Sequence, residues 1–92
     1  MIKVLYSPQI NIKDSLKYKF EGDKVTATLN GMTDIFDFTG MPDGAVDSVE
    51  TVLPMDVIIE AQKKDGFLWL TLLKFIPENA PQSDRFPTWQ VI

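Results

Sequence analysis

The chain has 92 residues, of which 45% are hydrophobic, and a formal net charge of −4. This length fits one domain spanning residues 1–92, and the hydrophobic fraction is too high for a disordered chain. The acidic balance disfavours binding to nucleic-acid phosphates, and the absence of cysteine excludes disulfides and thiolate metal sites.

The first predicted element is a strand over residues 2–6. It is expected to end at Ser7-Pro8, because proline cannot donate to a sheet ladder. Residues 9–15 are mostly polar and predict a loop or an irregular edge. The apolar run at the amino terminus is too short for a signal peptide, so we expect no secretion by that route.

The clearest local pattern is a three-stranded meander over residues 16–38. Apolar and polar residues alternate over 16–21 and again over 25–30, which is typical of strands with one buried face. Asn30-Gly31 is the preferred pair for a type I′ turn, because both residues tolerate positive φ. A third short strand is predicted over residues 33–38.

The middle of the chain is ambiguous. Residues 39–44 are rich in turn formers, with Pro42 and Asp43 at the centre of a predicted type I turn. Over residues 45–53 the apolar positions have a helical spacing, although several are β-branched valines, which weaken helix propensity. One short helix over 45–53 is therefore an open alternative.

A second hairpin is predicted over residues 55–76, with Asp65-Gly66 as its turn. Both faces of its second strand, residues 67–76, are apolar. Such a strand must be covered on both sides, so it is central in a sandwich, packed under a helix or buried in an oligomer. Residues 67–76 are about half as long as a membrane-spanning helix requires, so we expect no membrane insertion.

The last part of the chain predicts a surface loop followed by a docked terminus. Residues 77–87 contain three prolines among polar residues. The apolar residues of 86–92 predict a short edge strand. The elements together predict a mainly β fold: a small antiparallel sandwich or curled sheet, built from two hairpin units with at most one short helix.

Catalytic chemistry has few candidates in this composition. The chain has no histidine, which removes the commonest general base and transition-metal ligand, and its glycines match no phosphate-binding loop. Surface carboxylates are solvated by default, so we expect no enzyme, no catalytic residue, no cofactor and no metal. The acids that a carboxylate hydrolase or a calcium site would need are Asp34, Asp37, Asp43, Asp47 and Glu50.

Four residues are candidates for contact with a partner protein or a sugar: Trp89, Phe86, Trp69 and Met41. Tryptophan is enriched in binding hot spots, and Trp89 follows a proline-containing loop. A lid over a small core is the simpler interpretation of Trp89. Trp69 lies in the most apolar segment, where a place in the core is the simpler interpretation.

The turn and strand segments of the chain occur in a familiar order. They resemble small uncharacterised proteins of tailed bacteriophages and prophages, encoded among tail and tail-fibre genes. The resemblance implies no activity and no catalytic residue. The segments that carry it are residues 6–9, 30–31, 36–44, 65–73, 79–81 and 85–87.

The resemblance and the doubly apolar strand favour a non-enzymatic tail-module protein that acts by protein–protein contacts. It would be a minor structural component or an assembly factor, with other phage tail proteins or copies of itself as partners. It would reside in the host cytoplasm during assembly, or in the virion. The alternative is a carbohydrate-binding accessory domain of a tail fibre, in which Trp89 and a tyrosine stack on sugars. A hydrolase built on carboxylates is the third hypothesis.

Overall fold

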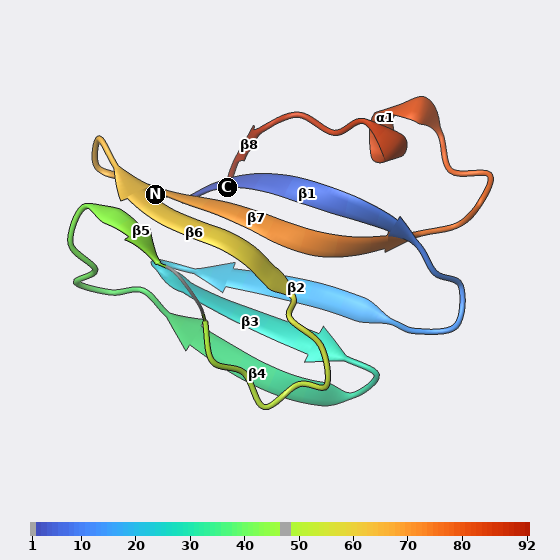
Figure 1. The fold of residues 1–92 in the computed structure, drawn as a ribbon, viewed down its shortest axis with the longest axis horizontal. Coiled ribbons are helices and arrows are strands. Elements are labelled where there is room, and N and C mark those ends of the chain that lie inside the picture. Colours follow the sequence, from blue (N-terminus) through green and yellow to red (C-terminus); the bar gives the residue numbers. More distant parts are fainter. Residues whose placement is uncertain (1, 47–48) are drawn as a thin grey trace.

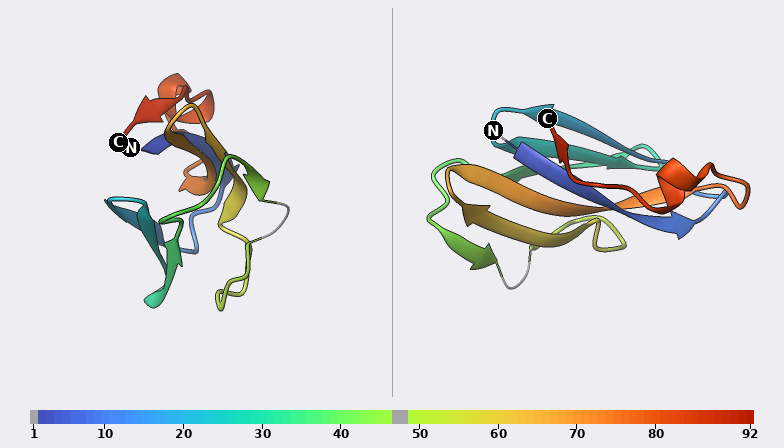
Figure 2. Two further views of the ribbon diagram at one scale, coloured as in Figure 1. Left: turned by 90° about the vertical axis from the view of Figure 1, so that its left-hand side faces the viewer. Right: turned by 90° about the horizontal axis from the view of Figure 1, so that it is seen from above.

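The computed structural model describes residues 2–46 and 49–92. It confirms the predicted mainly β class, with two sheets that lie one over the other (Figures 1 and 2). Three strands form one sheet in the order β2-β3-β4, and five form the other in the order β5-β6-β7-β1-β8. The elements are β1 (Ile2–Ile10), β2 (Leu16–Glu21), β3 (Lys24–Leu29), β4 (Met32–Asp37), β5 (Gly44–Val46), β6 (Ile58–Lys64), β7 (Phe67–Ile76), α1 (Gln82–Arg85) and β8 (Gln90–Val91).

Both predicted hairpin units are present. In the meander, β3 pairs antiparallel with β2 and with β4, and Asn30 and Gly31 have φ of 50° and 83°, as a type I′ turn needs. In the second hairpin, β6 pairs antiparallel with β7. Its turn residues Asp65 and Gly66 have φ of 54° and 79°, which again fits a type I′ turn. The first strand of this hairpin begins at Ile58, later than predicted.

The five-stranded sheet is mixed, because β1 runs parallel to β7 along its whole length. Ile2 lies opposite Leu68, and Ile10 lies opposite Ile76. Parallel neighbours need a long crossover connection, and here the crossover contains the entire three-stranded sheet. As a result, β7 is a central strand between β6 and β1, with one face toward the other sheet.

The predicted end of β1 at Ser7-Pro8 is wrong, since the strand continues to Ile10. The backbone of Ile2 faces β8, because its carbonyl accepts a hydrogen bond of 2.8 Å from the Ile92 N–H. Backbone direction alternates along a strand, so Pro8 faces the same side as Ile2. The pairing with β8 covers Lys3 and Val4 only, so the missing N–H of Pro8 costs no ladder bond.

The middle of the chain differs from the prediction. The hydrogen-bonded turn lies at residues 38–41, where the Met41 N–H donates to the Phe38 carbonyl and Gly40 has φ of 75°. The helix suggested over 45–53 is wrong for the described part of that range. Strand β5 pairs with β6, and residues 49–53 are not helical. Valines favour a pleated, half-buried strand over a helix. Positions 47 and 48 lie outside the described residues.

The tail contains a helical turn within the predicted loop. Helix α1 (Gln82–Arg85) begins after Pro81, whose carbonyl accepts hydrogen bonds from the Asp84 and Arg85 N–H groups. A proline just before or at the first helical position is favourable, because its fixed φ suits the helix start. The predicted docking of the terminus is confirmed, since β8 pairs antiparallel with β1.

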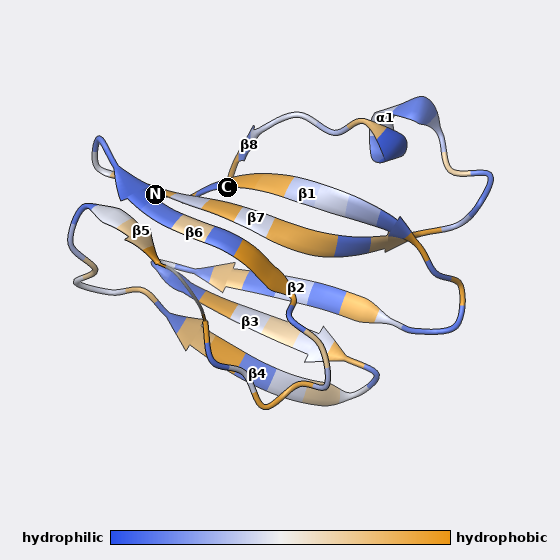
Figure 3. Ribbon diagram, viewed as in Figure 1, coloured by the Kyte–Doolittle hydropathy of each residue, from blue (hydrophilic) through white to orange (hydrophobic). Residues whose placement is uncertain are grey.

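The core lies between the two sheets. Leu68, Leu70 and Leu72 alternate along β7 and have no exposed surface. They face Val25 and other buried residues of the three-stranded sheet. Hydrophobic colour is strong along β7 in Figure 3, whereas α1 is mostly hydrophilic.

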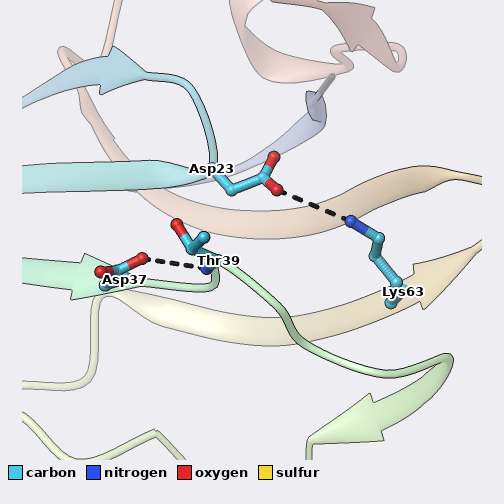
Figure 4. Close-up of polar contacts among 4 residues, drawn as sticks. All are labelled: Asp23, Asp37, Thr39 and Lys63. Carbon is cyan, nitrogen blue, oxygen red and sulfur yellow. Dashed lines mark hydrogen bonds and ion pairs between the residues drawn. The ribbon is translucent and has the colours of Figure 1, made fainter.

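Polar contacts fix the loops around this core. The Lys63 ammonium on β6 lies 3.7 Å from the Asp23 carboxylate in the turn between β2 and β3, so this ion pair joins the two sheets (Figure 4). Asp37 accepts a hydrogen bond of 2.9 Å from the Thr39 N–H and so shapes the exit from β4 (Figure 4). Such partly exposed ion pairs contribute at most about 1 kcal/mol, so burial remains the main source of stability.

The edges of the three-stranded sheet are protected. Edge strand β2 carries Lys17 and Lys19, which disfavour pairing with another chain. Along edge strand β4, Asp34 accepts hydrogen bonds from the Thr51 hydroxyl at 2.7 Å and the Val52 N–H at 3.1 Å. These bonds hold the loop between β5 and β6 against β4. In the other sheet, the edge strands β5 and β8 are only three and two residues long.

We expect the stability of the fold to decrease above about pH 10 because of Tyr18. Its hydroxyl donates to the Leu73 carbonyl, and burial, together with the nearby Tyr6, raises the pKa of Tyr18. Tyrosine in the unfolded chain ionises near pH 10, whereas folded Tyr18 stays protonated to higher pH. The contribution of protonated Tyr18 to the free energy of unfolding is therefore lost as the pH rises above about 10. When the pH is raised from below about 10 to above that value, the urea midpoint of Tyr18→Phe should fall less than that of the parent chain. An equal fall in both proteins would contradict this assignment.

Candidate functional site

The two outer faces of the sandwich have different chemistry. On the three-stranded sheet, the outward residues are almost all polar: Lys17, Lys19, Glu21, Lys24, Thr26, Thr28, Thr33, Ile35 and Asp37. On the five-stranded sheet, large apolar side chains lie among the polar ones: Lys3, Leu5, Glu60, Gln62, Lys64, Phe67, Trp69, Thr71 and Val91. We call this second surface the aromatic face.

Strand register places Trp69 at the centre of the aromatic face. Trp69 on β7 lies opposite Lys3 on β1 and opposite Gln62 on β6. In the next outward row, Thr71 lies opposite Leu5 and Glu60. Residues in register on one face have Cβ atoms about 5 Å apart, so these side chains are direct neighbours.

Three aromatic rings and one ammonium group form a cluster around Trp69. The ring centroids of Trp69 and Trp89 are 5.1 Å apart at an interplanar angle of 79°, and those of Phe67 and Trp69 are 6.5 Å apart at 65°. The Lys3 ammonium lies 4.3 Å from the centroid of Trp69 and 4.4 Å from that of Phe67. Edge-to-face rings and a cation over their faces are favourable arrangements, so the cluster holds its own geometry.

A small pocket opens beside this cluster, over β6 and β7. Its volume is about 160 Å³, and we call it the indole pocket. Trp69 is fixed in its wall, because the indole N–H donates a hydrogen bond of 3.3 Å to the Lys64 carbonyl. Trp89 has 44% of its surface exposed. The pocket is lined by Glu60, Gln62, Lys64, Trp69, Thr71 and Trp89.

The structure brings two of the four predicted contact residues together. Trp69 and Trp89 share the indole pocket, and Trp69 is half-buried on the outer face instead of lying in the core. Phe86 is 72% exposed in the segment between α1 and β8, and it does not line the pocket. Met41 packs against the core between the sheets and so lies apart from the other three.

The tyrosines do not join the tryptophans, so the predicted pairing of Trp89 with a tyrosine is wrong. Tyr6 and Tyr18 pack against the core, and their ring centroids are 6.2 Å apart. Sequence reasoning also missed Lys3 and Glu60 as neighbours of the tryptophans. The register of the β6–β7 hairpin places Glu60 beside Thr71 and Trp69, whereas Lys3 is revealed only by the pairing of β1 with β7, which no local pattern encodes.

The candidate acids do not form a catalytic pair among the described residues. Asp34 and Asp37 are three positions apart on β4, so they point to opposite faces of the strand. Hydrogen bonds from Thr51 to Asp34 and from Thr39 to Asp37 lower the pKa of both carboxyls, the reverse of what a general acid needs. Asp43 and Glu50 are exposed, and Asp47 lies outside the described residues.

Over residues 2–46 and 49–92, no three acidic side chains gather closely enough to hold a metal ion. In the same ranges, no helix is long and apolar enough to cross a membrane. No protein-family model, curated protein or solved structure matches the chain.

Proposed function

We propose that the chain is a non-enzymatic phage or prophage tail-module protein that works by contact with other tail proteins. It acts as a minor structural component or an assembly factor, present in the host cytoplasm during assembly or in the virion. The sequence resemblance supports the phage setting. The exposed apolar end of the chain supports the mode of action.

The observation that carries this proposal is a strip of exposed apolar side chains at the carboxyl terminus. Phe86, Val91 and Ile92 are 72%, 62% and 47% exposed, and we call them the carboxyl-terminal strip. Val91 and Ile92 are held at the edge of β1 by the β8 pairing and by the Ile92 N–H bond to Ile2, and Phe86 lies in the segment between α1 and β8. Exposed apolar side chains that the backbone holds in place, as Val91 and Ile92 are, suit docking to a partner.

The protected sheet edges favour a different protein as the partner over a second copy. Strand pairing between copies is opposed at β2 by its lysines, at β4 by the loop that lies along it, at β5 by its shortness and on the open side of β1 by Pro8. The carboxyl-terminal strip is apolar and uncharged, so it would contact an apolar patch on another tail protein.

Co-purification with the tail proteins encoded beside it tests the proposal, with the mass of each complex measured by light scattering. We expect a stable complex with one of them. The double variant Phe86→Ser/Val91→Thr should bind at least about tenfold more weakly, because a few central apolar residues dominate most interfaces.

The matched control is Ile35→Thr, which alters an equally exposed isoleucine on the opposite, polar face. It should bind like the parent chain. A monomer at all concentrations that associates with none of the tail proteins would overturn the proposal.

A further inference from the structure

The indole pocket combines an accessible indole ring with several polar groups. Trp89 supplies the accessible ring, whereas Lys3 already lies over Trp69. The two rings stand at 79°, so one can form a floor and the other a wall. A ligand with one flat apolar side and a polar rim would fit such a corner.

The polar lining offers hydrogen bonds of both kinds. Glu60 only accepts, the Lys64 ammonium only donates, and Gln62 and Thr71 do both. Among the described residues, none of these four side chains makes a hydrogen bond or ion pair with another residue. The hydrogen-bonding groups of these four side chains are therefore available to a ligand.

The charges of the pocket favour an uncharged ligand. One carboxylate, Glu60, and one ammonium, Lys64, line it, so their formal charges cancel. A cationic ligand would be repelled by Lys64 and by Lys3, which already interacts with the face of Trp69. A nucleotide would bring phosphate charge to a protein with a net charge of −4.

The size of the pocket limits the ligand to a single ring. Its volume of about 160 Å³ is well below the roughly 300–1,000 Å³ of pockets that enclose drug-sized molecules. The walls are also held before any ligand binds. The Trp69 indole is bonded to the Lys64 carbonyl, and Trp89 immediately precedes β8. Little ordering is then needed on binding.

We propose that the indole pocket binds one uncharged pyranose ring of a glycan. The C–H face of the sugar stacks on Trp89, and its hydroxyls bond to Glu60, Gln62 and the other polar groups of the lining. This activity goes beyond the proposed protein contact and uses different residues from the carboxyl-terminal strip.

Tryptophan fluorescence tests this directly, because both tryptophans of the chain line the pocket. The probes are the methyl glycosides of glucose, galactose, mannose and N-acetylglucosamine. We expect a saturable change in emission with at least one of them, with a Kd in the millimolar range that is common for single-ring contacts. The same sugar should shift the amide resonances of Gln62 and Thr71.

Trp89→Ala should weaken sugar binding at least about tenfold, while Trp89→Phe keeps a stacking ring and loses less. Glu60→Gln should also weaken binding, because the amide accepts more weakly than the carboxylate. Phe86→Ala is the matched control: it removes an exposed aromatic ring from the same segment but outside the pocket, and sugar binding should not change.

Three outcomes would overturn the proposal. They are the absence of a saturable response to all four glycosides together with an empty glycan array, unchanged sugar binding in Trp89→Ala, and saturation by tetramethylammonium but by no sugar. If the co-purification test finds no partner, the sugar-binding test still stands. The two tests use different residues, because Phe86→Ser/Val91→Thr keeps every lining residue of the pocket.

Discussion

Leu70→Ala should lower the free energy of unfolding by about 2–5 kcal/mol. Leu70 has no exposed surface and lies on the central strand, opposite Val4 of β1 and Ala61 of β6. Backbone hydrogen bonds on both sides hold β7 in place, so the sheet cannot collapse into the cavity. A domain of this size has about 5–15 kcal/mol in total, so the loss is a large share of its stability.

Urea unfolding followed by tryptophan emission would measure this loss as a lower midpoint. Ile35→Ala is the control, because Ile35 is 61% exposed on the polar outer face. It should change the free energy of unfolding by no more than about 0.5 kcal/mol. If Leu70→Ala unfolded at the same urea concentration as Ile35→Ala, Leu70 could not lie in the core.

The sequence was sufficient to predict the parts of the fold that local chemistry determines. Asn30-Gly31 and Asp65-Gly66 require positive φ, and the alternation on either side sets the register of each hairpin. The parallel pairing of β1 with β7 could not be predicted in this way, because it joins strands from opposite ends of the chain. Pro8 is tolerated inside β1 because its backbone faces the β8 side, where the pairing covers only Lys3 and Val4.

The helix wrongly suggested over residues 45–53 shows that sheet pairing can outweigh local helix propensity. The apolar spacing of residues 45–53 fits a helix, yet Gly44–Val46 gains ladder bonds to β6 as strand β5. In the tail, Pro81 sets the start of α1 although the composition indicates a loop. Only three or four residues decide each of these outcomes, and so short a segment cannot show a periodic pattern of apolar positions.

The candidate site was only partly predictable for the same reason. Trp69 and Trp89 were candidate contact residues from their type alone, but the β6–β7 hairpin and the segment before β8 must meet to build the indole pocket. Strand β1 lies between β7 and β8, and it brings Lys3 beside Trp69 while β8 carries Trp89 onto the same face. The pocket is therefore a product of topology, and the chemistry of its lining becomes apparent only once the register is known.

Phe36→Ala should show whether the two sheets form one cooperative unit. Phe36 belongs to β4 in the three-stranded sheet, is 5% exposed, and shares one core with the leucines of β7. Removing the ring should cost about 3–5 kcal/mol, as for other buried phenylalanines.

The two tryptophans report only on the five-stranded sheet, whereas far-ultraviolet circular dichroism reports on both. If the sheets stabilise each other through their shared core, Phe36→Ala should lower the urea midpoint equally by both probes. A midpoint that falls by circular dichroism but not by tryptophan emission would mean that the five-stranded sheet, with its aromatic face, remains folded without its partner sheet. The indole pocket would then remain formed while β2, β3 and β4 unfold. A common midpoint would instead make the core between the sheets a condition for the pocket to exist.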